Sequence, residues 1–115
     1  MTVKKNNLRR RTFSTKKVEG LEPIVVEIDD KEFHAHPRLP GAVLLEFMQA
    51  STEDGASIAA GMFDFLKNAF PEDEYTKLNE TLHDADNVVD EEMIGDIVAY
   101  LIEEYTASRP TEASE

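Results

Sequence analysis

The most constraining feature of this sequence is a stretch near its C-terminal end in which large apolar residues recur every three or four positions. The stretch, "DEEMIGDIVAYLIEEYTA", begins at Asp90. Such spacing places apolar side chains along one side of an α-helix, which is stable only when that side is buried. We therefore expect a helix over 90–106, with Asp90 as N-cap and Val89 and Ile94 as a hydrophobic staple. The apolar stripe consists of Ile94, Ile97, Val98, Leu101, Ile102 and Tyr105.

A second pattern, "PIVVEIDDKEFHAHP", predicts two short strands around an acidic turn. β-Branched residues precede the Asp29–Asp30–Lys31 turn, and apolar and polar residues alternate after it. We expect strands at 24–28 and 32–36. An isolated hairpin is marginal in water, so this one must pack against the helices. The inward-facing residues would be Ile24, Val26 and Ile28 on one strand and Phe33 and Ala35 on the other.

Two helices are expected directly after the hairpin. Pro40 and Gly41 suit the start of a short, heavily buried helix of about three turns. Apolar residues at helical spacing then predict a second helix over roughly 54–69, with Ser51 or Thr52 as its candidate cap.

Pro71 ends that second helix and opens a third, mostly exposed helix over about 71–84. The predicted fold class is therefore mainly α: an N-terminal β-hairpin followed by about four helices in a small bundle. We expect a flexible basic arm at 1–20, one folded domain at 21–107 and a disordered polar tail at 108–115.

The net charge of −12 conceals an asymmetry between the two ends of the chain. Residues 1–17 carry seven of the 12 bases and no acid, giving +7, whereas the remainder carries five bases and all 24 acids, giving −19. The acidic body repels phosphate backbones, which disfavours nucleic-acid binding and leaves only the arm for it. The arm either docks onto an acidic surface or is a solvated tail that folds back weakly on the body.

Several classes of chemistry lack their residues in this sequence. There is no cysteine, no membrane-length apolar window and no nucleotide-binding or hydrolase motif, so we expect a cytoplasmic, non-enzymatic protein without a cofactor. Glu32, His34 and His36 have acceptable spacing for metal ligands on a strand. They lack a fourth ligand, and the solvent-facing side of a hairpin commonly carries such residues, so we expect no metal.

The two helices after the hairpin carry more apolar residues than one buried face needs. Positions 62, 63, 65 and 66 are all apolar and span nearly a whole turn. Such a helix is either central or lies against a partner. The sequence leaves open which residues are core and which contact a partner. The candidate partner-binding residues are Leu44, Phe47, Met48, Met62, Phe65 and Leu66.

Taken in order, these pieces resemble the tail assembly chaperones of long-tailed (siphovirus-type) phages that infect actinobacteria. The resemblance covers about residues 21–115 and depends on "VVEIDDKEFHAHP", "LPGAVLLEFMQA", the late helix and the ending "SRPTEASE" with Arg109, Pro110 and Thr111. The basic arm at 1–17 is longer than the resemblance leads us to expect.

The resemblance implies a chaperone of virion morphogenesis that binds the tape measure protein, recruits tail tube subunits and leaves before the tail is finished. It also implies a longer, frameshifted form of the chain as a further partner, and self-association is another candidate. The location would be the cytoplasm of the infected or lysogenic host. The alternatives are a head-tail connector or tail completion protein retained in the virion, and an acidic module that masks a basic partner.

The tail "SRPTEASE" has two interpretations. Pro110 disfavours helical geometry at Arg109, so the last helix should stop near Ala107. The remaining residues are either an ordinary frayed end or a linker to the second domain of a frameshifted form.

Overall fold

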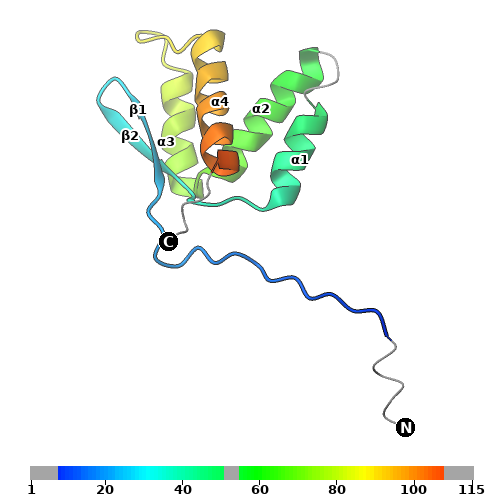
Figure 1. Cartoon of the computed structure of the whole chain (residues 1–115). Coiled ribbons are helices and arrows are strands. Elements are labelled where there is room, and N and C mark those ends of the chain that lie inside the picture. Colours follow the sequence, from blue (N-terminus) through cyan, green and yellow to red (C-terminus); the bar gives the residue numbers. More distant parts are fainter. Residues whose placement is uncertain (1–7, 51–54, 108–115) are drawn as a thin grey trace.

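The computed structural model describes residues 8–50 and 55–107, which form one β-hairpin followed by four α-helices (Figure 1). This is the mainly α architecture predicted from the sequence, and the predicted bounds agree to within about two residues. The elements are β1 (Ile24–Ile28), β2 (Lys31–Ala35), α1 (Gly41–Ala50), α2 (Gly55–Ala69), α3 (Glu72–Leu82) and α4 (Glu91–Ala107).

The hairpin closes through a two-residue turn, which is tighter than the predicted three-residue turn. Asp29 and Asp30 have φ angles of 49° and 73°, the left-handed values that a type I′ turn requires at both central positions. The strands pair antiparallel with Val26 opposite Phe33. As a consequence, β2 begins and ends one residue earlier than predicted.

One face of the hairpin is buried, as the alternation of the sequence predicts. Val26, Ile28, Phe33 and Ala35 are each at most 6% exposed, and Ile24 packs against them from the start of β1. Since paired residues on neighbouring strands project to the same side, the two strands contribute to a single apolar surface.

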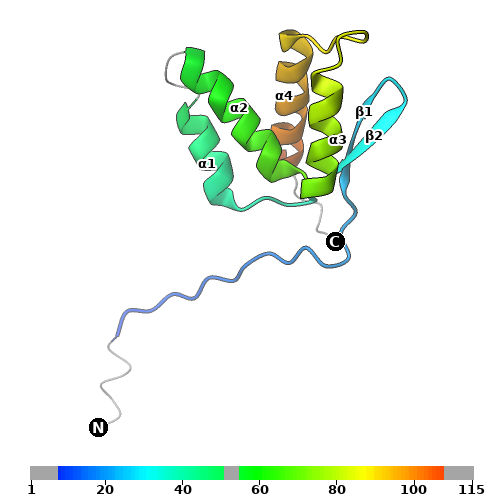
Figure 2. The ribbon, with the colours of Figure 1, turned by 180° about the vertical axis from the view of Figure 1, so that it is seen from behind.

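The helices α3 and α4 lie on the same side of this two-stranded sheet, where α3 contacts β2 and α4 contacts β1 (Figures 1 and 2). The backbone N–H of His34 in β2 donates a 2.9 Å hydrogen bond to Oε1 of Glu74 in α3. The hydroxyl of Tyr100 in α4 lies 3.5 Å from the carbonyl oxygen of Val25 in β1. Unpaired backbone groups at a sheet edge recruit other strands, so both contacts protect the hairpin from pairing with another chain.

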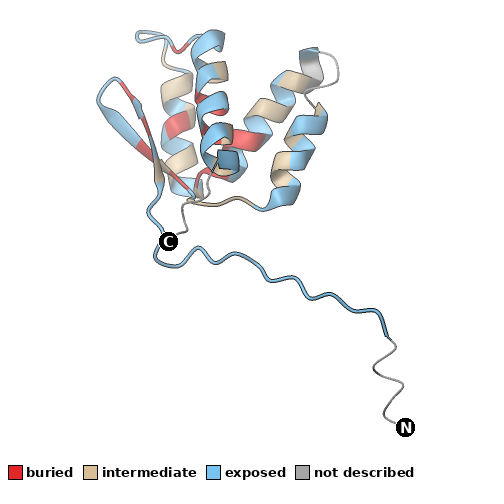
Figure 3. Cartoon of the chain, in the orientation of Figure 1, coloured by how far each residue is buried: buried red, intermediate tan, exposed pale blue. Residues whose placement is uncertain are grey.

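The core lies where the hairpin meets α3, α4 and the C-terminal half of α2 (Figure 3). Helices that cover a small sheet on one side bury their apolar stripes together with its apolar face. The largest fully buried side chains are Phe65, Leu66, Leu78 and Leu101.

The two last helices begin as the sequence predicts. α3 follows Pro71 and carries Glu72, Asp73 and Glu74 in its first turn, where acids suit the positive end of the helix dipole. Within α3, all of which is described, Leu78 alone is buried, five residues are exposed and five are half-buried. The helix is therefore less exposed than the sequence predicts.

α4 begins with the predicted cap. Oδ1 of Asp90 accepts a 2.9 Å hydrogen bond from the backbone N–H of Met93, which satisfies one of the free donors of the first turn. Val89 and Ile94 both lie at the core, as a hydrophobic staple requires.

The loop between α3 and α4 is ordered by one carboxylate. Oδ1 of Asp84 accepts hydrogen bonds from the backbone N–H groups of Asp86 at 2.8 Å and Asn87 at 3.3 Å. These hydrogen bonds stabilise the ionised form and lower the pKa of Asp84.

The described part of the basic arm, residues 8–20, forms neither helix nor strand, and every residue in it is exposed. The rest of that arm, the candidate caps Ser51 and Thr52, and the tail 108–115 lie outside the described residues. Within the described ranges, no helix combines the length and apolar character needed to cross a membrane.

Candidate partner-binding surface

α1 differs from the other helices because it lies on the outside of the bundle. It packs chiefly against α2, on the side of α2 away from the hairpin (Figures 1 and 2). Nine of its ten residues are uncharged, yet none is buried, and Figure 3 shows no buried segment along it. The expectation of a heavily buried helix is therefore wrong. A helix is buried on all sides only when several elements surround it, and α1 has one neighbouring helix.

Two contacts hold α1 against α2. The rings of Phe47 and Phe65 are tilted by 39° with centroids 5.3 Å apart, a geometry favourable for aromatic pairs. Gly61 faces Ala50 so closely that a Cβ atom added to Gly61 would lie 2.9 Å from the Cβ of Ala50. The absence of a side chain at Gly61 thus allows the two helices to approach each other.

The opposite side of α1 presents apolar residues to solvent. Leu45 is 66% exposed and Met48 is 43% exposed, and Leu44 beside them is half-buried. Because residues three apart are neighbours on a helix, Leu45 and Met48 form one surface, which we call the α1 outer face. Leu44 lies at its margin and packs against the core. Exposed apolar surface of this kind is typical of sites where another protein binds.

The structure separates the six candidate partner-binding residues into three groups. Phe65 and Leu66 are each 1% exposed and belong to the core, so in this conformation they cannot contact a partner. Leu44, Phe47 and Met62 are half-buried and pack against the core from its margin. Met48 is exposed.

On α1 and α2, sequence reasoning missed two exposed apolar residues. Leu45 belongs to the α1 outer face. Its exposure could have been predicted from the unbroken apolar run over 43–45, because a helix that packs on one side must expose part of such a run. Phe63 is 38% exposed on α2. Phe63 lies two residues after Gly61, which faces α1, so the Phe63 side chain points away from α1. It is therefore separate from the α1 outer face.

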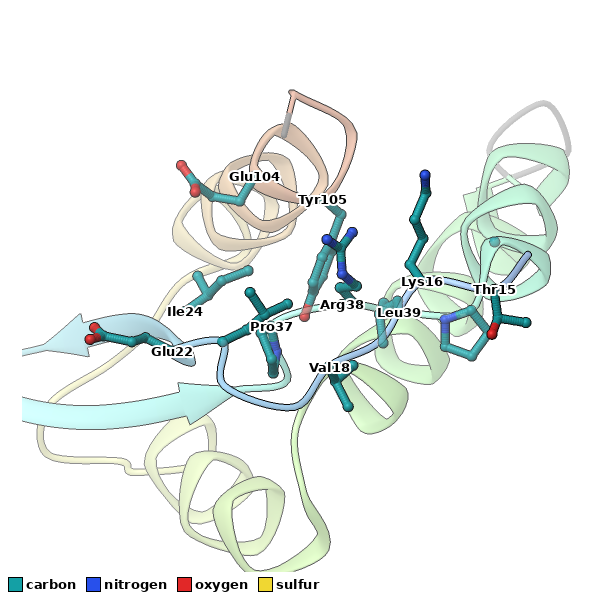
Figure 4. Close-up of a pocket in the computed structure, with 13 residues that line it drawn as sticks. Thr15, Lys16, Val18, Glu22, Ile24, Pro37, Arg38, Leu39, Glu104 and Tyr105 are labelled. Atoms are coloured by element: carbon teal, nitrogen blue, oxygen red, sulfur yellow. The ribbon is translucent and has the colours of Figure 1, made fainter. Parts of the chain in front are cut away.

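An open groove of about 770 Å³ lies beside the root of the basic arm (Figure 4). Its walls are the arm around Val18, the segment 37–41 and the end of α4 at Tyr105. The sequence did not predict this groove, because its walls come from three segments that are distant along the chain. Charged residues of both signs line it: Lys16, Arg38, Glu22 and Glu104.

Burial in the bundle perturbs two tyrosines of α4. Loss of hydration raises the pKa of the Tyr105 phenol far above its usual value. Partial burial, with a smaller contribution from the negative charge of Glu104, raises the pKa of Tyr100. Both phenols therefore stay neutral and can donate hydrogen bonds to the backbone.

His34 in β2 and His36 just after it contact neighbouring carboxylates and helix ends. Nε2 of His34 lies 3.7 Å from Oε1 of Glu32, and its Nδ1 lies 3.8 Å from Oε2 of Glu74. The backbone of His36 bonds to the ends of α2 and α4. In the described part of the chain, no group of three or more acidic, histidine or cysteine residues is placed to hold a metal ion.

The predicted junction residues Arg109, Pro110 and Thr111 lie outside the described residues. Ala107, near which the sequence predicts that the helix stops, is the last described residue and still belongs to α4. Comparisons of the chain with protein-family models, with curated proteins and with solved structures find no match.

Proposed function

We propose that this protein is a tail assembly chaperone of a long-tailed phage or prophage of actinobacteria. It acts without enzymatic chemistry in the cytoplasm of the infected or lysogenic host, binds the tape measure protein and recruits tail tube subunits to it. It leaves before the virion matures. The proposal is supported by the resemblance of its sequence elements, in their order, to those of such chaperones.

The exposure of α1 is the observation that supports a binding role. This helix has one charged residue in ten and no buried residue, and it leaves Leu45 and Met48 exposed to solvent. Fully burying a leucine or methionine side chain contributes about 1.5–3 kcal/mol. Covering Leu45 and Met48 with a client helix would therefore supply several kcal/mol of binding free energy.

A long helical client suits this surface. An amphipathic helix can lay its apolar stripe on the α1 outer face, which has the spacing of a helix-recognition site. Such binding is driven by burial of apolar area and depends weakly on salt, because screening acts on charges. The acidic body would keep the complex soluble through its net charge.

The test is co-expression of the full chain with the cognate tape measure protein. The wild-type chain should keep the tape measure protein soluble, and the variant Leu45→Asp/Met48→Asp should weaken binding by about tenfold or more, the effect of removing apolar anchors from an interface. Val88→Asp is the control for an acidic charge placed at an exposed apolar position elsewhere, because Val88 is 69% exposed on the loop before α4. Both variants should keep the wild-type stability, since substitutions at exposed positions have small effects.

Equal binding by the Leu45→Asp/Met48→Asp variant would place the client elsewhere. Purified virions separate the proposal from the alternative of a connector or completion protein. A chaperone is absent from mature particles, whereas a connector is retained in them. Detection of this chain by mass spectrometry in stoichiometric amounts in virions would contradict the chaperone role.

A further inference from the structure

We propose that the basic arm of one copy of this chain binds the exposed acidic face of α4 on a second copy. The acidic face of α4 consists of Glu92, Asp96 and Glu103, flanked by Met93 and Tyr100. This contact is separate from the α1 outer face, so it does not depend on the proposed function.

The arm is built for contact with another surface. Every described arm residue is exposed, with Leu8 62% exposed and Phe13 78% exposed. The guanidinium carbon of Arg11 lies 5.1 Å from the centroid of the Phe13 ring. Arginine and aromatic residues are enriched where proteins meet other proteins, because they combine bidentate hydrogen bonding with large contact areas.

The root of the arm directs it away from its own body. A turn from Val18 to Leu21 is closed by a 3.1 Å hydrogen bond between the backbone N–H of Leu21 and the carbonyl oxygen of Val18. Gly20 has a φ of 83°, a value that favours glycine. Nε of Arg38 then donates a 3.1 Å hydrogen bond to the carbonyl oxygen of Lys17.

Beyond this root the arm extends away from the bundle, and both views show it leaving the body (Figures 1 and 2). Thr15 and Lys16 of the arm line the open groove together with Glu104 at the end of α4. The acidic stripe of Glu92, Asp96 and Glu103 stays exposed. To reach the acidic face of its own α4, the arm would have to reverse its direction at the root. It can reach the acidic face of α4 on a second copy without this reversal.

The exposed side of α4 is acidic along its length. Glu92, Asp96 and Glu103 are all exposed, and spacings of four and seven residues align them in one stripe. The sequence of α4 contains no lysine or arginine. Among the described residues, the ion pairs involve Glu32 and Glu74 and none of the α4 acids.

The charges of the arm and of the acidic stripe match in spacing as well as in sign. From Arg11 to Lys16, an extended chain spans about 17 Å. From Glu92 to Glu103, which are 11 residues apart on α4, the stripe also spans about 17 Å at 1.5 Å per residue. With the arginines at 9–11 near one end of the acidic stripe and the lysines at 16–17 near the other, Phe13 would lie near its middle. Tyr100, 40% exposed, and Met93, 39% exposed, offer apolar contact there.

Charge complementarity favours a second copy over nucleic acid as the occupant. The +7 arm attracts any polyanion, but the attached body carries −19 and repels a phosphate backbone brought near it. The acidic body of a second copy instead supplies aligned carboxylates, with which arginine forms bidentate pairs.

The test uses two full-length variants with reversed charges. The arm variant carries Arg9→Glu, Arg10→Glu and Arg11→Glu, and the face variant carries Glu92→Arg, Asp96→Arg and Glu103→Arg. In sedimentation velocity at about 0.1 M salt, wild type should show a mass that rises with concentration. Each variant alone should be monomeric. The association of wild type should weaken about tenfold or more at about 1 M salt, where the Debye length is about 3 Å.

The decisive measurement is a mixture of the two variants. Each arm then meets a face of opposite charge on the other chain, so an equimolar mixture should regain association. Docking of the arm on its own body predicts no such recovery. A control with Glu27→Arg, Glu32→Arg and Glu80→Arg has the same change in net charge as the face variant but keeps the α4 face, and it should associate like wild type.

The isosteric face variant Glu92→Gln/Asp96→Asn/Glu103→Gln keeps the experiment informative if charge reversal unfolds α4, and it should also be monomeric. A monomeric wild type, or a variant mixture that stays monomeric, would overturn the proposal. Arm-dependent binding of duplex DNA at about 0.1 M salt, without association of the protein, would assign the arm to nucleic acid instead.

Discussion

Tyr105 joins three parts of the body through one hydroxyl group and one ring. Its hydroxyl donates a 2.7 Å hydrogen bond to the carbonyl oxygen of His36, just after β2. The backbone N–H of His36 donates a 2.7 Å hydrogen bond to the carbonyl oxygen of Ala69, at the end of α2. The Tyr105 ring meets the Phe65 ring edge-on, with centroids 6.3 Å apart. A single residue of α4 therefore ties the hairpin to α2.

Replacing Tyr105 by phenylalanine should lower the free energy of unfolding by about 1 kcal/mol at neutral pH, because the His36 carbonyl loses a hydrogen bond. The pH dependence should change as well. Because the folded state raises the pKa of Tyr105, unfolded chains lose this proton first as the pH rises above about 10, and wild-type stability should fall there.

The Tyr105→Phe variant should show a smaller loss of stability between pH 9 and pH 11 than wild type. Urea unfolding at several pH values measures both effects, with Tyr75→Phe as the control for the loss of a tyrosine hydroxyl elsewhere. An identical alkaline loss in wild type and Tyr105→Phe would show that Tyr105 is not the responsible group.

At the scale of elements, the hairpin is stable because helices cover its buried face and a helix side chain contacts an edge backbone group of each strand. Glu74 lies at the β2 edge with its side chain 15% exposed, and it accepts the backbone N–H of His34. Its carboxylate also lies 3.5 Å from Nζ of Lys77 in the same helix. This carboxylate replaces the neighbouring strand that an edge N–H would otherwise bind.

The substitution Glu74→Ala should therefore destabilise the protein by about 1.5–3 kcal/mol, the range for a hydrogen bond to a charged acceptor. Glu74→Gln keeps an acceptor oxygen and should cost less. The amide proton of His34 should exchange faster in Glu74→Ala, which hydrogen exchange measures at that residue. Glu80→Ala, at an exposed position of the same helix, is the control, and equal protection of the His34 amide in all three variants would contradict the role of Glu74.

At the scale of the whole molecule, the apolar core is drawn from residues between 24 and 105. The described arm contributes no buried residue to it. The arm touches the body through the exposed Arg38–Lys17 hydrogen bond and through the open groove. Such contacts contribute little to folding free energy compared with the buried clusters of α2 and α4.

Removal of residues 1–17 should consequently leave the helical circular dichroism spectrum and the cooperative melting transition intact. Removal of residues 109–115 should change the stability by no more than about 0.5 kcal/mol, as for other changes outside a core. Thermal melting of both truncated chains beside the full chain measures this. A chain that unfolds without its arm would show that the arm belongs to the folded unit.

Local patterns in the sequence were sufficient to predict the elements. The type and approximate bounds of the hairpin and the four helices, and the Asp90 cap, depend on contacts between residues a few positions apart. The cap, for example, joins Asp90 to Met93. Periodicity and turn residues carry this information directly, so it can be read without knowing how the elements pack.

The tertiary structure alone decided which apolar residues face the core and which face solvent. Phe65 is buried and Leu45 is exposed, although both belong to apolar stretches, because α2 touches the core and α1 touches little besides α2. The bonds from His34 to Glu74 and from Tyr105 to His36 span 40 and 69 positions. Contacts at such separations depend on the arrangement of whole elements in space, which no local pattern specifies.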